Sequence, residues 1–403
     1  MSRSAITDAE PVVLTDPDTL PGVRPVARPD GRLRPDAAYL ISGGLGALGL
    51  SLAERMVADG PTTLVLLGRS APGEQAAGRI ETLRRAGTRV ETVSCDVSDA
   101  DALTGALKAL TLPPIHGVVH AAGILQDATI GTLTPDGLAR VLAPKTAGAR
   151  NLEAATADQP LDFFVLFSSA AALFGLPGQA AYAAANAYLD AFAQHRRRRG
   201  RPALSVQWGP FADIGLAAAD ELRGDRLAER GVGAVGVEQA WQVLDALLDG
   251  DHDVAACAPL DPRRWFDAHP DSAAQGSWRR LRALADRDTD TDTDTDTDTD
   301  TDAVGGSGRF LAALLAAEPA EQLAAARAKV RELAGRVLRL DPAAIDADRP
   351  FKALGLDSLM SLELRNRLEA AFGLRLSPTL LWAFGTTDAL AAELRTRVCD
   401  AAS

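Results

Sequence analysis

Cysteine is scarce in this chain of 403 residues, which contains only Cys95, Cys257 and Cys399. The three lie far apart and form no Cys-x-x-Cys pair, which argues against a disulfide framework and against a zinc site. We therefore predict no bound metal, and we expect a reducing compartment, the cytoplasm.

Long apolar stretches are also lacking. No segment approaches the roughly 18 apolar residues of a membrane helix, and the N-terminus has no apolar centre of the kind that a secretion signal requires. The sequence therefore predicts no membrane partner.

Basic residues are outnumbered, with 42 Lys and Arg against 54 Asp and Glu and a net charge of −12. Eight of the acidic residues are aspartates between Asp288 and Asp302, so the rest of the chain is close to neutral. The one dense basic run, His195 to Arg201, ends a predicted helix, where cations suit the helix dipole. We therefore expect no nucleic-acid partner.

The acidic Asp-Thr segment, residues 286–308, has almost nothing apolar to bury, and its like charges repel. We interpret it as a spacer. A calcium-binding strip is the alternative, although the glycine turns of calcium sites are missing. The predicted organisation is a proline-rich tail or connector (1–35), an α/β domain (36–285), the acidic linker (286–308) and a small all-α domain (309–403).

Seven short apolar runs alternate with segments of helical periodicity in the predicted α/β domain. This alternation predicts a doubly wound parallel sheet with helices on both faces, the Rossmann arrangement. The predicted strands end at Ser42, Gly68, Cys95, Ala121, Ser168, Trp208 and Leu260.

A glycine-rich turn follows the first predicted strand and opens a helix. Gly44, Gly46 and Gly49 satisfy Gly-x-Gly-x-x-Gly, in which the glycines allow a tight turn, close approach of the backbone to a pyrophosphate, and packing of helix on strand. Because the motif lies in the strand, turn and helix order that it requires, we interpret it as a dinucleotide site. A purely structural glycine turn is the alternative.

The residues after the second and third predicted strands bear on the cofactor. Arg69 and Ser70 stand where an NAD enzyme would show an acidic residue, and a cation with a hydroxyl suits the 2′-phosphate of NADPH. Asp96, with Val97 beside it, could bond the adenine amino group. The alternative is that Asp96 caps the following helix.

Tyr182 is the candidate proton donor. Many nicotinamide-dependent reductases place a cation one turn after such a tyrosine, because a cation favours the ionised phenolate and makes the phenol a better acid. Here that position is Asn186. Ser169 closes the fifth strand, at the sheet edge that faces the ligand. Lys145, on the preceding helix, is the best candidate for the missing cation, with an ordinary surface lysine as the alternative.

Five segments together resemble the ketoreductase domain of modular type I polyketide synthases, which belongs to the short-chain dehydrogenase superfamily: "SGGLGALG", "HAAGILQDATI", "KTAGARNL", "LDFFVLFSSAAALFGLPGQAAYAAANAYLDAFA" and "LSVQWGPFADIGLAA". In these domains lysine and asparagine have exchanged places relative to Tyr-x-x-x-Lys. The resemblance implies that Tyr182 donates the proton and that Ser169 bonds the carbonyl. It also implies that Lys145 steadies the phenolate and the nicotinamide ribose, and that Asn186 orders a relay water.

The same resemblance implies a lid over nicotinamide and substrate in residues 211–224. It adds NADPH contacts at Gly43, Leu45, Ala121, Ala122, Gly123 and Pro210.

Residues that track stereochemistry in this family favour the class that gives the 3R hydroxyl, the B-type. Leu125 and Asp127 stand where that class has Leu-Asp-Asp, and Phe174 stands where the opposite class has tryptophan. Gln126 departs from the first pattern.

In this family a structural half precedes the catalytic half. The residues before the first predicted strand are too few for such a half. We therefore expect either reduced stability or an exposed sheet edge.

Ser358 begins a predicted helix in which Leu359, Leu362 and Leu368 fall at helical spacing. An N-cap serine is the simple interpretation. The stretch "LGLDSLMSLELRNRLEAAFG", however, resembles the Asp-Ser-Leu motif of type I acyl carrier proteins, which are small four-helix bundles. That resemblance implies 4′-phosphopantetheine on Ser358, attached by a phosphopantetheinyl transferase.

Taken together, the two resemblances imply an NADPH-dependent 3-ketoacyl-[acyl carrier protein] reductase that acts on a β-ketoacyl thioester. Its expected partners are the ketosynthase and acyltransferase domains of a polyketide synthase, in a pathway such as antibiotic biosynthesis. The alternatives are a carrier module whose reductase-like domain is a non-reducing scaffold, or an epimerase.

Overall fold

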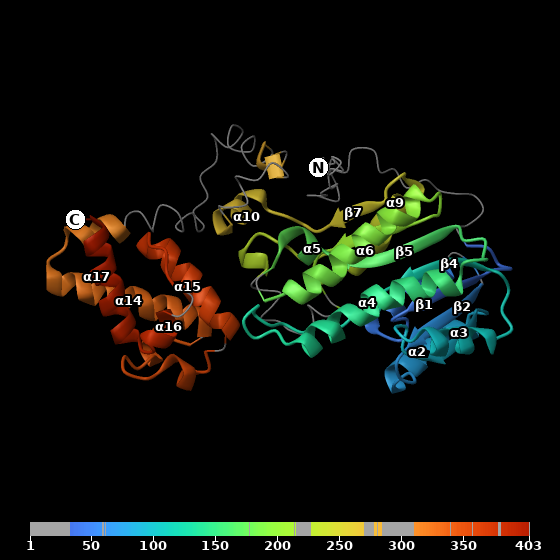
Figure 1. Cartoon of the computed structure of the whole chain (residues 1–403), viewed down its shortest axis with the longest axis horizontal. Helices are drawn as coiled ribbons and strands as arrows, with labels where there is room; N and C mark the ends of the chain where they lie inside the picture. The colour runs from blue at the N-terminus through green and yellow to red at the C-terminus, as the bar shows by residue number, and fades with distance from the viewer. Residues whose placement is uncertain are drawn as a thin grey trace. The chain divides into compact units, whose positions relative to one another are not determined.

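The computed structural model describes residues 33–283 and 310–402, apart from 59, 61, 177, 213, 215–226, 270–277, 280, 339, 357 and 378–379. The chain forms two compact units that divide between Thr291 and Asp292 (Figure 1). The predicted linker, most of the predicted connector and most of the predicted lid lie outside the described residues.

A seven-stranded parallel sheet forms the centre of the first unit, with the strand order β3-β2-β1-β4-β5-β6-β7. The order reverses direction beside β1, as it does in doubly wound sheets. The predicted fold class is therefore confirmed. The strands are β1 (Ala38–Ser42), β2 (Thr63–Gly68), β3 (Arg89–Ser94), β4 (Ile115–His120), β5 (Phe163–Ser169), β6 (Leu204–Trp208) and β7 (Val254–Cys257).

The last strand ends earlier than predicted, at Cys257 rather than Leu260. Pro259 has no amide hydrogen for a sheet hydrogen bond, and its carbonyl accepts from the amide of Gly233. Leu260 instead forms an isolated antiparallel bridge with Val232. The chain therefore leaves the sheet here.

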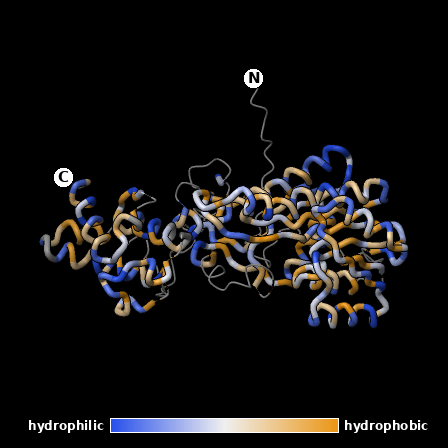
Figure 2. The backbone as a smooth tube through the Cα atoms, turned by 60° about the horizontal axis from the view of Figure 1, so that its bottom comes forward, coloured by the Kyte–Doolittle hydropathy of each residue, from blue (hydrophilic) through white to orange (hydrophobic). Residues whose placement is uncertain are grey.

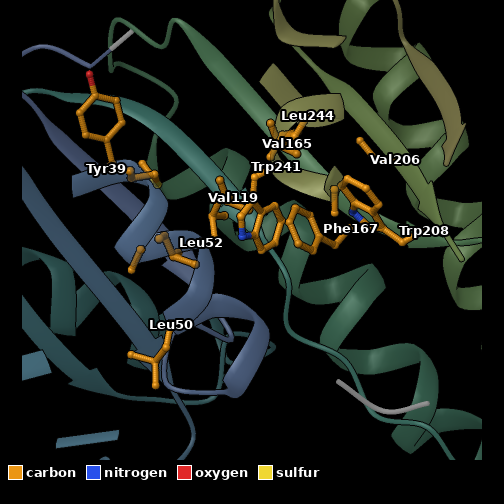
Figure 3. Close-up of a cluster of buried hydrophobic side chains, with 14 of the residues drawn as sticks. Tyr39, Leu50, Leu52, Val119, Val165, Phe167, Val206, Trp208, Trp241 and Leu244 are labelled. Carbon is orange, nitrogen blue, oxygen red and sulfur yellow. The ribbon is translucent and has the colours of Figure 1, made fainter. Parts of the chain in front are cut away.

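Helices cover both faces of the sheet, and each face buries its own apolar layer. One layer includes Leu50 of α1 and, in another part of the layer, Trp241 of α9 packed with Phe167 and Trp208 from the strands (Figure 3). The other layer lies under α3, α4 and α6. The helices of this unit are α1 (Ala47–Ala58), α2 (Glu74–Arg85), α3 (Ala100–Lys108), α4 (Pro135–Ala155), α5 (Ala170–Phe174), α6 (Ala180–Arg198), α9 (Val237–Asp249) and α10 (Pro262–Ala268).

The second unit is helical in its described part, as predicted. Its core contains the fully buried side chains of Leu364, Leu368, Leu390 and Leu394. Hydrophobic and hydrophilic residues alternate along its helices, so each helix has an apolar face for this core (Figure 2). Its elements are α14 (Pro319–Leu338), η3 (Pro342–Ala344), η4 (Phe351–Leu354), α15 (Ser358–Phe372), α16 (Leu380–Ala383) and α17 (Thr387–Ala402).

Across the described ranges of both units, we find no helix that combines the length and the apolar character needed to cross a lipid bilayer.

Candidate active site

A cavity of about 630 Å³ lies at the carboxyl ends of the strands in the first unit. This is the edge where open α/β sheets bind ligands. Three predicted residues do not line the cavity: Gly44, Asp127 and Asn186. The predicted residues that do line it are Gly43, Leu45, Gly46, Gly49, Arg69, Ser70, Asp96, Val97, Ala121, Ala122, Gly123, Leu125, Lys145, Ser169, Tyr182 and Pro210.

The glycine turn between β1 and α1 leaves no room for side chains. Gly43 has a φ of +72°, and a Cβ there would lie 2.9 Å from the carbonyl carbon of Ala121. A Cβ on Gly49 would lie 2.4 Å from the carbonyl oxygen of Gly43. The turn is therefore too tightly packed for side chains. Gly43, Gly46 and Gly49 also line the cavity at the start of α1, and a helix N-terminus is a place that suits a pyrophosphate.

Gly44 faces the sheet instead of the cavity. Its amide donates to the carbonyl of Leu67 at 3.1 Å, and a Cβ on it would lie 2.6 Å from the carbonyl oxygen of Ile41. Gly44 therefore packs against the sheet and does not line the cavity.

Asp96 follows β3 and accepts hydrogen bonds from the amide and the hydroxyl of Ser98, at 2.9 and 2.6 Å. These bonds lower the pKa of the Asp96 carboxyl, and the charge of Arg69 adds to the effect. The cap of α3 is Asp99, whose side chain accepts from the amide of Ala102. The alternative in which Asp96 caps this helix is therefore wrong.

Lys145 lies on α4 and is only 3% exposed, so the alternative of a surface lysine is wrong. Its Nζ donates to the carbonyl of Phe167 at 2.8 Å and lies 5.8 Å from the centre of the Tyr182 ring. Burial lowers the pKa of Lys145 to about 8, while the carboxylate of Asp190 acts in the opposite direction. At neutral pH the site therefore holds an ammonium group beside the tyrosine.

Ser169 ends β5 and is the N-cap of the short helix α5. Its Oγ accepts from the amide of Ala171 at 3.1 Å. Because that bond uses a lone pair, the hydroxyl proton stays available to donate to a ligand in the cavity.

Asn186 is fully buried one turn after Tyr182. Its Nδ2 donates to the carbonyl of Tyr182 at 2.8 Å, and its Oδ1 has no protein partner among the described residues. Buried amide oxygens normally accept a hydrogen bond. Oδ1 is therefore a buried acceptor whose hydrogen-bonding capacity the described protein groups leave unused.

Some of the residues expected to control stereochemistry line the cavity, and others do not. Leu125 and Phe174 line the cavity, whereas Asp127 accepts from Nε2 of Gln179 at 3.4 Å. The Phe174 ring packs against two aromatic neighbours, with centroids 4.5 Å from Trp265 and 5.7 Å from Trp278. Position 174, where the opposite class has tryptophan, therefore lies in a cluster of aromatic rings that borders the cavity.

The sequence analysis missed His120, the fully buried last residue of β4. Its Nδ1 lies 2.6 Å from the hydroxyl of Ser42, and a Cβ on Gly148 would lie 3.1 Å from its Cε1. Burial, together with the charge of Lys145, lowers the pKa of His120 to about 3. The only signal in the sequence is its place directly before "AAG", which says nothing about contact with the lysine.

In the second unit, Ser358 is the first residue of α15, as predicted. Gly355, with a φ of +91°, ends the short helix η4 before it. The side chains of Ser358, Leu359 and Leu362 lie outside the described residues. Of the three leucines predicted to share one face of this helix, Leu368 has a described side chain, and it is fully buried in the core.

Two family models match the chain. Residues 37–213 match the KR domain, and residues 328–394 match the phosphopantetheine attachment site. The second range contains Ser358. Domains of the first kind bind NADPH, and domains of the second kind carry 4′-phosphopantetheine.

Curated relatives are much longer proteins. A phenolphthiocerol/phthiocerol polyketide synthase protein of Mycobacterium tuberculosis is 37% identical over 366 residues, which is 90% of this chain and 16% of the relative. The phthioceranic/hydroxyphthioceranic acid synthase of the same organism is 38% identical over 351 residues, or 86% of this chain and 15% of the relative. The chain thus spans about a sixth of their length.

Solved structures give the same assignment. A-type ketoreductases from a modular polyketide synthase match with a TM-score of 0.58 and 38% identity, covering 63% of this chain and 55% of theirs. The first ketoreductase of the tylosin polyketide synthase matches with a TM-score of 0.55 and 37% identity, covering 62% and 56%. The chain therefore contains a ketoreductase domain of the polyketide synthase type, followed by an acyl carrier domain.

Proposed function

We propose that the first unit reduces a β-ketoacyl thioester to the β-hydroxyacyl thioester with NADPH, in polyketide biosynthesis. The observation that carries this proposal is the position of Lys145. Its ammonium group is buried beside the ring of Tyr182, in the same cavity as the glycine turn of the predicted dinucleotide site.

The residues that line the cavity are of the kinds that would bind the successive parts of NADPH. Gly43 and the N-terminus of α1 would hold the pyrophosphate through backbone amides. Arg69 and Ser70, both exposed at the end of β2, would hold the 2′-phosphate. When bound, the cofactor supplies the hydride that reduces the ketone.

The protein's own groups supply the proton. In our proposal the hydroxyl of Ser169 donates a hydrogen bond to the ketone oxygen and orients it. As negative charge develops there, the phenol of Tyr182 transfers its proton to that oxygen. The ammonium group of Lys145 stabilises the phenolate that remains, and a water on Oδ1 of Asn186 begins its reprotonation.

The first prediction tests this role of Tyr182. With a β-ketoacyl N-acetylcysteamine thioester, the wild-type chain is expected to oxidise NADPH, and Tyr182→Phe is expected to lower the rate by about 10²-fold or more. The measurement is nicotinamide absorbance, with Tyr188→Phe as the control for loss of a phenol elsewhere on α6. An inactive wild type, or a Tyr182→Phe variant with the wild-type rate, contradicts the proposal.

The stereochemical part of the proposal is a 3R product. Leu125 and Asp127 support it, together with Phe174 in place of tryptophan. Chiral chromatography of the product from the same reaction decides this part, and a 3S product contradicts it.

The second unit is proposed to carry the substrate on 4′-phosphopantetheine attached to Ser358. A phosphopantetheinyl transferase would load it, and ketosynthase and acyltransferase domains would exchange acyl groups with it. We keep the boundaries 36–285, 286–308 and 309–403 for reductase, linker and carrier. The free thiols of Cys95 and Cys257, both buried, suit a reducing cytoplasm.

The carrier proposal has a separate test. Incubation with a phosphopantetheinyl transferase and coenzyme A is expected to add the mass of one phosphopantetheine group to the wild type and none to Ser358→Ala. Ser361→Ala, one turn along α15, is the matched control. A mass gain that survives in Ser358→Ala contradicts the assignment.

A further inference from the structure

Behind the cavity, the sheet face under α4 and α6 carries a layer of buried polar side chains. Five members of this layer are 8% exposed or less: Lys145, Ser168, Asn186, Ser205 and Gln207. Asp190, two turns after Tyr182 on α6, is partly buried at the border of the layer.

The carboxylate of Asp190 is held by two donors of one strand. Ser205 donates to Oδ1 at 2.6 Å and Gln207 donates to Oδ2 at 2.8 Å, both from the same face of β6. Burial raises the pKa of Asp190, and these donors together with Lys145 act in the opposite direction. Donors to both oxygens favour the charged form.

Ser168 lies between the partners of Asp190 and of the lysine. It pairs with Gln207 in the register of β5 and β6, and it follows Phe167, whose carbonyl accepts from Nζ of Lys145. Its own hydroxyl donates to the carbonyl of Asn186 at 3.2 Å. Neighbouring residues of β6 and β5 therefore hold the carboxylate on α6 and the ammonium group on α4.

Lys145 needs an opposite charge, because an uncompensated buried cation is unstable. The other groups around it do not provide one. Phe167 offers a neutral carbonyl, Tyr182 a phenol, and His120 is uncharged at neutral pH because its pKa is lowered to about 3. Among the described side chains, Asp190 is the acidic group whose charge raises the pKa of Lys145.

We propose that Asp190 is a positioning residue that keeps Lys145 protonated during turnover, so that Tyr182 gives its proton beside a cation rather than beside a neutral amine. The carboxylate touches neither substrate nor cofactor and acts through the lysine. The inference deepens the proposed reductase function and rests on it.

Asp190→Asn tests the charge with little change in shape. The hydroxyl of Ser205 can rotate, and the amide of Gln207 can flip, so that both still bond to an asparagine. The readout is acetylation of Lys145 by acetic anhydride over a range of pH, followed by peptide mass spectrometry. In Asp190→Asn, the pH at which acetylation of Lys145 reaches half its maximal rate, which we call the Lys145 midpoint, is expected to fall by about one pH unit. The exposed Lys108 is the internal control, and its midpoint stays in place.

Ser205→Ala is the matched variant, because it removes one donor to Asp190 and leaves the charge. It is expected to leave the Lys145 midpoint near that of the wild type. The inference is overturned if Asp190→Asn leaves the midpoint unchanged, or if Ser205→Ala moves it equally far.

The pH profile of NADPH oxidation gives a second readout. Its alkaline limb is expected to move to lower pH in Asp190→Asn by the same amount, with most of the activity retained below neutral pH. An unmoved alkaline limb contradicts the inference. If the wild type oxidises no NADPH, the reductase proposal fails, while acetylation still tests the coupling between Asp190 and Lys145.

A double-mutant cycle of melting temperatures covers the case in which Asp190→Asn folds poorly. If the two charges compensate each other, Asp190→Asn lowers the melting temperature of the wild type more than that of the Lys145→Met variant. Equal losses in both backgrounds show an effect of packing alone and overturn the inference.

Discussion

At the scale of single residues, the site depends on titratable side chains that the fold buries. His120 illustrates this, because its ring is fully buried between the hydroxyl of Ser42 and the charge of Lys145. Its pKa of about 3 lies below the usual 6.5. Between pH 3 and pH 6.5 this histidine is therefore protonated in the unfolded chain and neutral in the folded chain. Folding stability therefore rises with pH across this window and falls as the solution is acidified.

We predict that His120→Asn reduces this acid sensitivity. Below pH 6.5 the unfolding free energy of the wild type is expected to fall, relative to the variant, by about 1.4 kcal/mol for each pH unit. Urea denaturation at several pH values measures the difference. His116→Asn is the control, because that side chain lies at the opposite end of β4 beside Asp162. A constant difference between wild type and His120→Asn across the acid range contradicts the prediction.

The residues of the site also show how much of it could be predicted from the sequence. The spacing of Ser169, Tyr182 and Asn186 is local, because the three lie on β5 and α6, which only the short helix α5 separates in the chain. Lys145 could be named as the best candidate for the cation from its place on the helix before β5, and the family resemblance supported that choice. Its contact with the carbonyl of Phe167 joins α4 to β5 and could not be predicted from the sequence. His120 resembles an ordinary strand histidine until β4 is known to lie next to β1. Asp190 resembles an ordinary helix aspartate until β6 is known to lie next to β5.

At the scale of elements, the basic run at the end of α6 has two kinds of arginine. The run was expected to end a helix, and four of its residues do lie in the last turn of α6. Arg196, however, is 2% exposed, lies 4.1 Å from the centre of the Phe164 ring and bonds to Glu153 of α4 at 2.7 Å. Helical periodicity alone does not distinguish this arginine from its exposed neighbours.

We predict that Arg196→Met weakens the contact between α4 and α6. Because the carboxylate of Glu153 is only 18% exposed, removing its partner is expected to lower the unfolding free energy by about 3 kcal/mol. Arg197→Met is the matched control and is expected to cost less than about 1 kcal/mol, since its partner Asp251 is 93% exposed. Urea denaturation of both variants measures the contrast, and equal losses contradict the buried role of Arg196.

At the scale of the whole molecule, two units with separate cores share one chain. The strand pattern and the helical pattern predicted this division, because each reflects burial within its own unit. Each unit also has its own cluster of buried apolar side chains. Stability and chemistry in one unit should therefore respond little to changes in the core of the other.

The last prediction follows from that independence. Leu368 is fully buried in the core of the second unit, and Leu368→Ala is expected to destabilise that unit by about 3 kcal/mol. Phosphopantetheinylation of Ser358 at raised temperature then falls, because the transferase requires a folded carrier. NADPH oxidation with the free thioester stays at the wild-type rate, because that substrate bypasses the carrier. Leu189→Ala, in the core under α6, is the reciprocal control and should lower oxidation while leaving Ser358 loading intact. If either substitution impairs both activities equally, the two cores are coupled and the chain folds as one cooperative unit.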